Sequence, residues 1–157
     1  MKKLPLLLCS LLLLSAATCH KHPDIVYRRL NNANHDIFAG FAFINATYLY
    51  PDTSFDQLMD YQLIKSHSFD LLRSGESLEE SVIRTTPKDT VSIFYFHADT
   101  VNKYSWEIIQ RDYKILRRYD LSTQDIITLK NKKNGIPEIP YPPDERMKDM
   151  KMYPPYN

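Results

Sequence analysis

Glycine is scarce in this chain of 157 residues, and its scarcity excludes several kinds of active site. It occurs only at positions 40, 75 and 135, so the chain has neither a glycine-rich loop that cradles phosphate nor the Gly-x-Ser-x-Gly elbow of a nucleophilic serine. The His-Glu-x-x-His motif of zinc hydrolases is absent as well. The sequence therefore predicts no cofactor, no metal ligand and no catalytic residue.

An excess of charge of either sign is also missing. The chain carries 20 basic and 19 acidic residues. Two of the basic residues, Lys2 and Lys3, belong to the leader described next, so the rest of the chain has 18 basic against 19 acidic residues. Such a balance gives no long-range attraction to nucleic acid or anionic lipid, and we expect no nucleic-acid partner.

The first nineteen residues have the organisation of an export signal. Lys2 and Lys3 give a positive start, residues 4–14 form an apolar run, and residues 15–18 form a small-residue exit before Cys19. The apolar run is too short for a well-anchored membrane span. A cysteine directly after such an exit is the pattern of a bacterial lipoprotein signal, which is cleaved before the cysteine and acylated on it. We therefore predict a signal peptide at 1–18.

An ordinary secretory signal that leaves Cys19 as a free thiol is the alternative. Ala16 stands where the commonest lipoprotein pattern has leucine. Cys9 lies inside the signal, however, so Cys19 is the single cysteine of the mature chain. A lone cysteine at the start of an exported chain is better explained as an acylated residue than as a structural one. We predict lipid attachment (palmitate) at Cys19 and a location in the cell envelope, anchored to the periplasmic or surface face of the outer membrane.

Residues 19–24 form a short polar tether between the anchor and the rest of the chain. Six extended residues span about 20 Å, so the domain would stay close to the membrane. His20 and His22 beside Cys19 suggest a metal site, but acylation would remove the thiol and the spacing matches no closed tetrahedral site. A solvated linker is the expected structure.

Residues 25–135 predict a single β-rich domain. A run at 25–30, a turn rich in Asn and Asp at 31–36 and an apolar run at 37–44 together suggest a hairpin. Residues 91–96 have β-branched and aromatic side chains on both faces and predict a strand in the centre of a sheet. Residues 114–119 add a further strand. The predicted fold is a small antiparallel β-sandwich with two short helices, with an α+β arrangement as the alternative.

The two helices are predicted from their first residues. Ser105 can accept a hydrogen bond from the free amides of one first turn, and Ser122 can do so in the other, where Asp125 completes a capping box. The second helix is expected to stop within 130–134, with Gly135 as a left-handed cap.

Residues 56–84 fit neither a helical nor a strand period cleanly. One face of a helix would hold Leu58, Tyr61 and 63–64 if the segment is helical, whereas 69–72 indicate a strand that enters a turn at 73–76.

The C-terminal segment 136–157 has a different composition, since it holds six of the ten prolines. Tyr-Pro-Pro occurs at 141–143 and again at 153–155. Extended polyproline geometry is expected. This tail is either a docking strip for an aromatic-lined partner, or an arm along the domain or a disordered end.

The segment 88–122, which includes Tyr-Ser-Trp-Glu-Ile-Ile-Gln-Arg-Asp-Tyr at 104–113, resembles a group of small lipoproteins of unknown function from Bacteroidetes-type bacteria, as does Tyr-Pro-Asp-Thr-Ser at 50–54. The likeness covers about 25–130. It implies a cell-envelope location and no particular activity.

The same resemblance implies candidate O-glycosylation sites. Bacteria of this type attach glycans to Asp-Ser/Thr-apolar triplets, and two triplets match, with Thr90 and Thr100 as the acceptors. Turn chemistry at the two ends of a strand explains the same residues without modification. Thr100 is the better candidate because it is expected to be exposed.

His97 and Asp99 offer the one enzyme hypothesis, a small periplasmic or surface hydrolase in which the carboxylate supports a histidine base. A histidine hydrogen-bonded to its own turn is the alternative. Glu76, Glu79 and Glu80 are paired carboxylates in principle, but a solvated charged face explains them better. The preferred hypothesis is a non-enzymatic interaction or structural module that binds an envelope protein or glycan; oligomeric state is not predicted.

Overall fold

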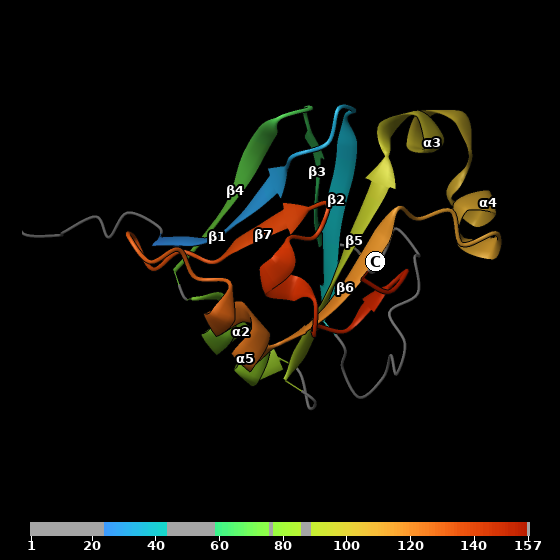
Figure 1. Cartoon of the computed structure of the whole chain (residues 1–157). Coiled ribbons are helices and arrows are strands. Elements are labelled where there is room, and N and C mark those ends of the chain that lie inside the picture. The colour runs from blue at the N-terminus through green and yellow to red at the C-terminus, as the bar shows by residue number, and fades with distance from the viewer. Residues whose placement is uncertain (1–23, 44–58, 76, 86–88, 157) are drawn as a thin grey trace, which may run out of the picture.

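The computed structural model of the chain describes residues 24–43, 59–75, 77–85 and 89–156, which are mainly β. Figure 1 shows the strands as two layers with short helices at both ends. This confirms the predicted fold class. The strands are β1 (Asp24–Asn31), β2 (Ile37–Phe43), β3 (Met59–Ile64), β4 (Ser68–Ser74), β5 (Thr90–His97), β6 (Arg117–Ser122), β7 (Glu138–Tyr141) and β8 (Met152–Tyr153). The helices are α2 (Leu78–Thr85), α3 (Ala98–Lys103), α4 (Trp106–Arg111), α5 (Thr123–Thr128) and the 3₁₀ turn η2 (Glu145–Met147).

The strands form a three-stranded sheet in the order β4-β1-β7 and a five-stranded sheet in the order β3-β2-β5-β6-β8. All neighbours are antiparallel except β1 and β7, which are parallel. The predicted hairpin of β1 with β2 is wrong, because the turn between them carries the chain from one sheet to the other. β2 pairs with β3 on one edge and β5 on the other, so neither edge is free for β1.

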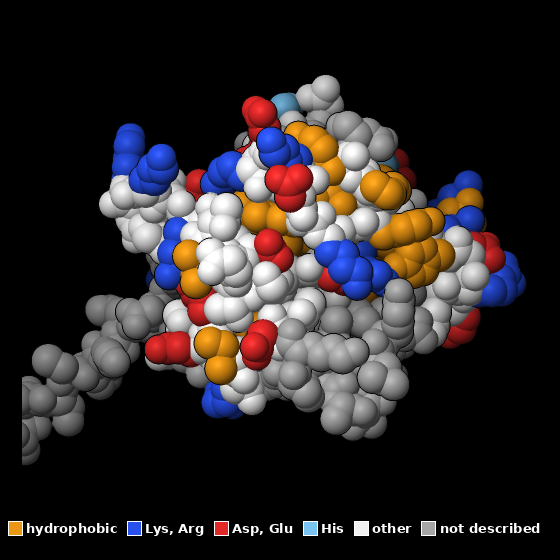
Figure 2. Space-filling view, turned by 60° about the horizontal axis from the view of Figure 1, so that its bottom comes forward, with side chains coloured by type: hydrophobic (Ala, Val, Ile, Leu, Met, Phe, Trp, Pro, Cys, Tyr) orange, Lys and Arg blue, Asp and Glu red, His pale blue; other side chains and the backbone are white. Residues whose placement is uncertain are grey.

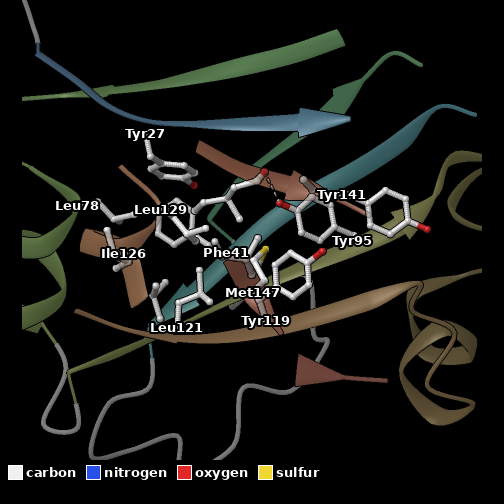
Figure 3. Close-up of a cluster of buried hydrophobic side chains, with 14 of the residues drawn as sticks. Tyr27, Phe41, Leu78, Tyr95, Tyr119, Leu121, Ile126, Leu129, Tyr141 and Met147 are labelled. Carbon is white, nitrogen blue, oxygen red and sulfur yellow. Dashed lines mark hydrogen bonds between the residues drawn. The ribbon is translucent and has the colours of Figure 1, made fainter. Parts of the chain in front are cut away.

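The main core lies between the two sheets, where side chains from β1, β2, β5, β6, β7, α2 and α5 converge (Figure 3). A second, smaller cluster lies on the other face of the five-stranded sheet, where Phe94 and Phe96 pack against α4 residues Trp106 and Ile109. β5 is the third of five strands and is buried along both faces. The prediction that 91–96 form a central strand is therefore confirmed.

The helix starts follow local capping chemistry, with one exception. Ser122 and Asp125 form the predicted capping box of α5. Ser105 precedes α4, but its side chain accepts no capping bond, and it hydrogen-bonds the Glu107 carboxylate instead. α5 ends at Thr128, earlier than predicted, and Gly135 (φ 71) closes the turn that follows the helix rather than the helix itself. Its amide donates to the Asn131 carbonyl at 2.8 Å.

Two further helices were not predicted. α3 begins directly after β5, and α2 begins after Ser77, whose hydroxyl accepts from the Glu80 amide at 3.2 Å while Glu80 Oε2 accepts from the Ser77 amide at 3.1 Å. This is a capping box of the Ser-x-x-Glu type that the sequence contains. The helical alternative for Tyr61 and Ile64 is wrong, because both lie in β3. Among the described residues, no helix is long and apolar enough to cross a membrane.

The C-terminal segment is part of the domain rather than a tail. β7 pairs with β1, and Ile139 and Met147 are fully buried in the main core. Residues 138–141 form a strand rather than isolated polyproline structure, because a proline carbonyl still accepts, and Pro137 accepts from the Arg28 amide of β1 at 2.8 Å. The Pro140 carbonyl accepts from the Tyr119 hydroxyl at 2.9 Å. The predicted boundary at Gly135 therefore does not mark the end of the core.

A buried arginine connects the two sheets. Arg29 of β1 is 0% exposed, and its Nε donates to Asp70 Oδ1 of β4 at 3.0 Å, while its Nη2 donates to Oδ2 of the same carboxylate. Its Nη1 donates to the Ala39 carbonyl of β2, in the other sheet, at 3.1 Å. Burial opposes the charge, but Tyr27 and Asp70 outweigh it and hold the pKa of Arg29 above its ordinary value.

Asn31 makes a second polar connection, at the corner where both sheets turn. Its Nδ2 donates to the carbonyls of His35 at 2.8 Å and of Ile64 and Lys65 at 3.1 Å each. Its Oδ1 accepts from the Ala33 amide at 3.0 Å. One buried amide therefore joins the β1–β2 turn to the β3–β4 turn.

We predict that Asp70→Ala lowers the free energy of unfolding by about 3 kcal/mol, because it leaves the Arg29 guanidinium buried without its carboxylate. Urea denaturation at neutral pH measures the loss. Lys65→Ala is the control, since it removes the exposed ion pair with Asp36 and should cost less than about 1 kcal/mol. Equal losses in the two variants would contradict the role given to the buried pair.

The core tyrosines predict a second result, at alkaline pH. Burial raises the pKa of Tyr95 and of Tyr119, so the folded protein favours their neutral forms. Their contribution is fully present below the ordinary tyrosine pKa of about 10 and is lost as the pH rises further. Near-ultraviolet absorbance should show these tyrosines ionising only as circular dichroism reports unfolding. Complete ionisation near pH 10 with the fold intact would disprove their burial.

Candidate functional site

The predicted enzyme residues lie together where β5 ends and α3 begins. His97 is the N-cap of α3, and its Nδ1 accepts from the Asp99 amide at 3.1 Å. The Asp99 carboxylate lies 3.7 Å from the same nitrogen and is 89% exposed. Because Nδ1 already accepts a bond, it carries no proton to donate to that carboxylate. The pair therefore lacks the geometry of a histidine base oriented by an aspartate.

His97 is also held from the other side by a stacked ring. The His35 ring lies parallel to it, with centroids 4.5 Å apart and an interplanar angle of 15°, and His35 meets the Tyr141 ring edge-on at 6.1 Å. Nearby, a hydrogen bond from Lys65 lowers the pKa of Asp36. Asp36 and His97 thus bond to neighbouring side chains or to the backbone, whereas His35 Nε2 is buried without a hydrogen-bond partner in the described part of the chain. Among the described residues, no group of three or more His, Cys, Asp or Glu side chains is arranged to hold a metal ion.

The other predicted site residues are scattered. Cys19 and Glu76 lie outside the described residues. Thr90 is half-buried at the start of β5, and Thr100 is half-buried within α3 rather than exposed as expected.

The solvated-face interpretation of the glutamates is wrong for Glu79. Its side chain is buried and pairs with Lys130 Nζ at 2.5 Å, which connects α2 to the end of α5. Glu80 is exposed but caps α2, as described above.

A different region presents aromatic side chains to solvent. We call it the C-terminal aromatic surface and define it by Tyr113, Tyr153, Pro154, Pro155 and Tyr156. The Tyr153 ring is packed edge-on against Tyr113, with centroids 5.2 Å apart, and the residue is 49% exposed. In Figure 2, a broad group of hydrophobic side chains, in orange, lies on the right of the view. The C-terminal end of the chain also lies to the right of centre in Figure 1.

Tyr113 has a strained backbone that favours a role beyond packing. It directly follows the C-cap of α4 with φ 49, a position where helices commonly have glycine. A bulky side chain in this left-handed conformation costs about 1–3 kcal/mol and persists only when its surroundings hold it. Strain of this kind is concentrated at functional sites.

Buried polar groups hold the Tyr113 ring in place. Arg118 Nη1 donates to the Tyr113 hydroxyl at 2.9 Å, and Arg118 Nη2 donates to Asp120 Oδ2 at 3.1 Å. Asp120 also accepts from the Ser92 hydroxyl at 2.6 Å and pairs with Lys151 Nζ at 3.3 Å. Burial raises the pKa of the Tyr113 hydroxyl, which therefore remains neutral at physiological pH.

A second arginine fixes the last residues of the chain. Arg117 Nη1 donates to the Pro155 carbonyl at 3.0 Å and to the Pro154 carbonyl. The predicted tail therefore lies on the domain with Tyr153 and its prolines at the surface. Sequence reasoning missed Tyr113, Arg118 and Asp120. The available signal was the alternation in β6, where Arg118 and Asp120 share one face and Tyr119 and Leu121 share the other.

Comparison of the chain with protein-family models, with curated proteins and with solved structures finds no match. The C-terminal aromatic surface is therefore assigned as the candidate site on its geometry alone.

We predict that His97→Ala lowers the free energy of unfolding by about 1 kcal/mol, because α3 loses its capping acceptor. His97→Asn should retain most of that stability, since the asparagine oxygen accepts from the same amide. Urea denaturation of both variants checks this. If His97→Asn is destabilised as much as His97→Ala, the stack on His35 holds the corner and the cap does not.

Proposed function

We propose that this protein is a lipoprotein of a bacterial cell envelope, anchored through Cys19, whose domain is a non-enzymatic module that binds an envelope protein or glycan. The anchor is supported by the leader, in which a positive start, a short apolar run and a small-residue exit end directly before Cys19. The resemblance of residues 88–122 to small envelope lipoproteins supports the same location.

The binding role is carried by one observation, the exposed and rigid C-terminal aromatic surface. Tyr153 is half-exposed although it packs on Tyr113, and Tyr113 is held in a costly conformation by Arg118. Tyrosine provides a large contact area with a polar tip and loses little conformational freedom on binding, which explains its enrichment at interfaces. Rings that are already fixed need less ordering when a partner binds.

We predict that Tyr153→Ala weakens binding of the intact protein to its envelope partner by about tenfold, as expected for an exposed aromatic anchor. The acylated protein, immobilised as bait, is incubated with solubilised native envelope, and bound proteins and glycans are quantified by mass spectrometry.

Leu63→Ala is the matched control, because Leu63 is 41% exposed and lies in β3, at the opposite edge of the five-stranded sheet from β8. Thermal unfolding verifies that both variants are folded. A partner that is retained by Tyr153→Ala but lost with Leu63→Ala would contradict this surface. Recovery of no partner above a lipid-anchored control protein would contradict the binding role itself.

A further inference from the structure

The end of the domain nearest the anchor is fixed by where β1 begins. β1 is the middle strand of the three-stranded sheet, and its first residue, Asp24, follows Cys19 by five residues. Five residues span less than about 20 Å when fully extended. If Cys19 is anchored as proposed above, the groups beside the start of β1 must therefore lie close to the bilayer surface.

Cationic side chains lie on both sides of that start. On one side, Arg73 of β4 pairs with Ile25 in the antiparallel register. On the other side, the segment that leads into β7 runs beside β1, with the Arg28 amide donating to the Pro137 carbonyl at 2.8 Å. The turn between Asn131 and Ile136, which precedes this segment, carries Lys132 and Lys133. Figure 1 shows this turn and the beginning of β1 together at the left end of the domain.

Among the residues whose side chains the structure describes, these three cations form no ion pair. Lys132, Lys133 and Arg73 are all exposed. Among the acidic side chains that the structure describes near this end, Glu138 pairs with Arg28 at 3.0 Å and Glu79 pairs with Lys130 at 2.5 Å. In Figure 2, lysine and arginine side chains, in blue, lie along the left margin of the domain.

The turn that carries the two lysines is preformed. Asn131 Oδ1 accepts from the Lys133 amide at 2.9 Å, and the Gly135 amide donates to the Asn131 carbonyl at 2.8 Å. Gly135 has φ 71, a conformation that glycine adopts without strain. The backbone that carries the lysines therefore needs no further ordering when it meets a charged surface.

We infer that Lys132, Lys133 and Arg73 contact the anionic phosphates of the bilayer that holds the anchor, and that this contact orients the domain. The inference rests on the proposed lipid anchor. Each cation near such a surface strengthens the contact by about fivefold. The chain as a whole has no cationic excess, so the anchor must first bring this end to the bilayer. In Figure 1 the C-terminal end of the chain lies beside β6, to the right of the beginning of β1, so the C-terminal aromatic surface lies apart from this contact.

The test uses the acylated protein purified from its envelope and reconstituted into vesicles of phosphatidylcholine, with or without one third phosphatidylglycerol. Acetylation of individual lysines is followed by mass spectrometry. Lys132 and Lys133 should react about fivefold more slowly on the anionic vesicles than on the neutral ones. Lys103 in α3, at the far end of the domain, should react at the same rate on both.

A second readout uses Trp106, the chain's single tryptophan, which lies in α4 at that far end. Energy transfer from Trp106 to a dansyl-labelled lipid should be low on anionic vesicles. It should rise when Lys132→Glu and Lys133→Glu are combined, because the domain loses its orientation. Lys103→Glu, which changes the charge at the other end, should leave the transfer low.

The outcomes separate this inference from the proposed function. A protein that does not associate with either vesicle has no anchor, which overturns both. A protein that associates with both vesicles, but whose Lys132 and Lys133 react equally on the two, keeps its anchor and overturns the orienting contact alone.

Discussion

The buried guanidinium of Arg29 is the interaction on which the two-sheet arrangement depends. Strands joined by short turns lie in different sheets in this fold, so ladder hydrogen bonds between chain neighbours do not hold the sheets together. Arg29 joins β1 and β4 through Asp70 and reaches the Ala39 carbonyl of the opposite sheet, and Asn31 connects the two turns where the chain crosses over. Apolar side chains of both sheets surround these contacts.

Sequence reasoning was successful where a local signal was enough. The crowded strand at 91–96 and the Ser122 capping box follow from residues within a few positions of one another. It was wrong for the β1–β2 hairpin, because β2 pairs instead with β5, whose residues lie 48 (Phe43 and Val91) to 60 (Ile37 and His97) positions further along the chain. The alternative that the proline-rich segment lies along the domain is confirmed, but its pairing as β7 was not predicted, since β7 finds its ladder on β1, at the other end of the chain.

The same distinction applies to the candidate site. His97 and Asp99 are close in sequence, which suggested a catalytic pair. In the structure His97 is instead the N-cap of α3 and accepts a hydrogen bond from the Asp99 amide. Tyr113, Arg118 and Asp120 lie within eight residues of one another, but Tyr153 joins them only when β8 pairs with β6, so no short motif contains the whole group. The proposed membrane contact uses the residues beside the start of β1, and the proposed partner contact uses the surface around β8.

Intact-mass spectrometry of the protein isolated from its native envelope measures directly whether Cys19 is the anchor on which the proposed function depends. A lipoprotein has the mass of residues 19–157 increased by covalently attached acyl chains, and the increase is located on the N-terminal peptide. A chain that still begins at Met1, or one that begins at Cys19 with a free thiol, would contradict the anchor and the orientation inferred from it.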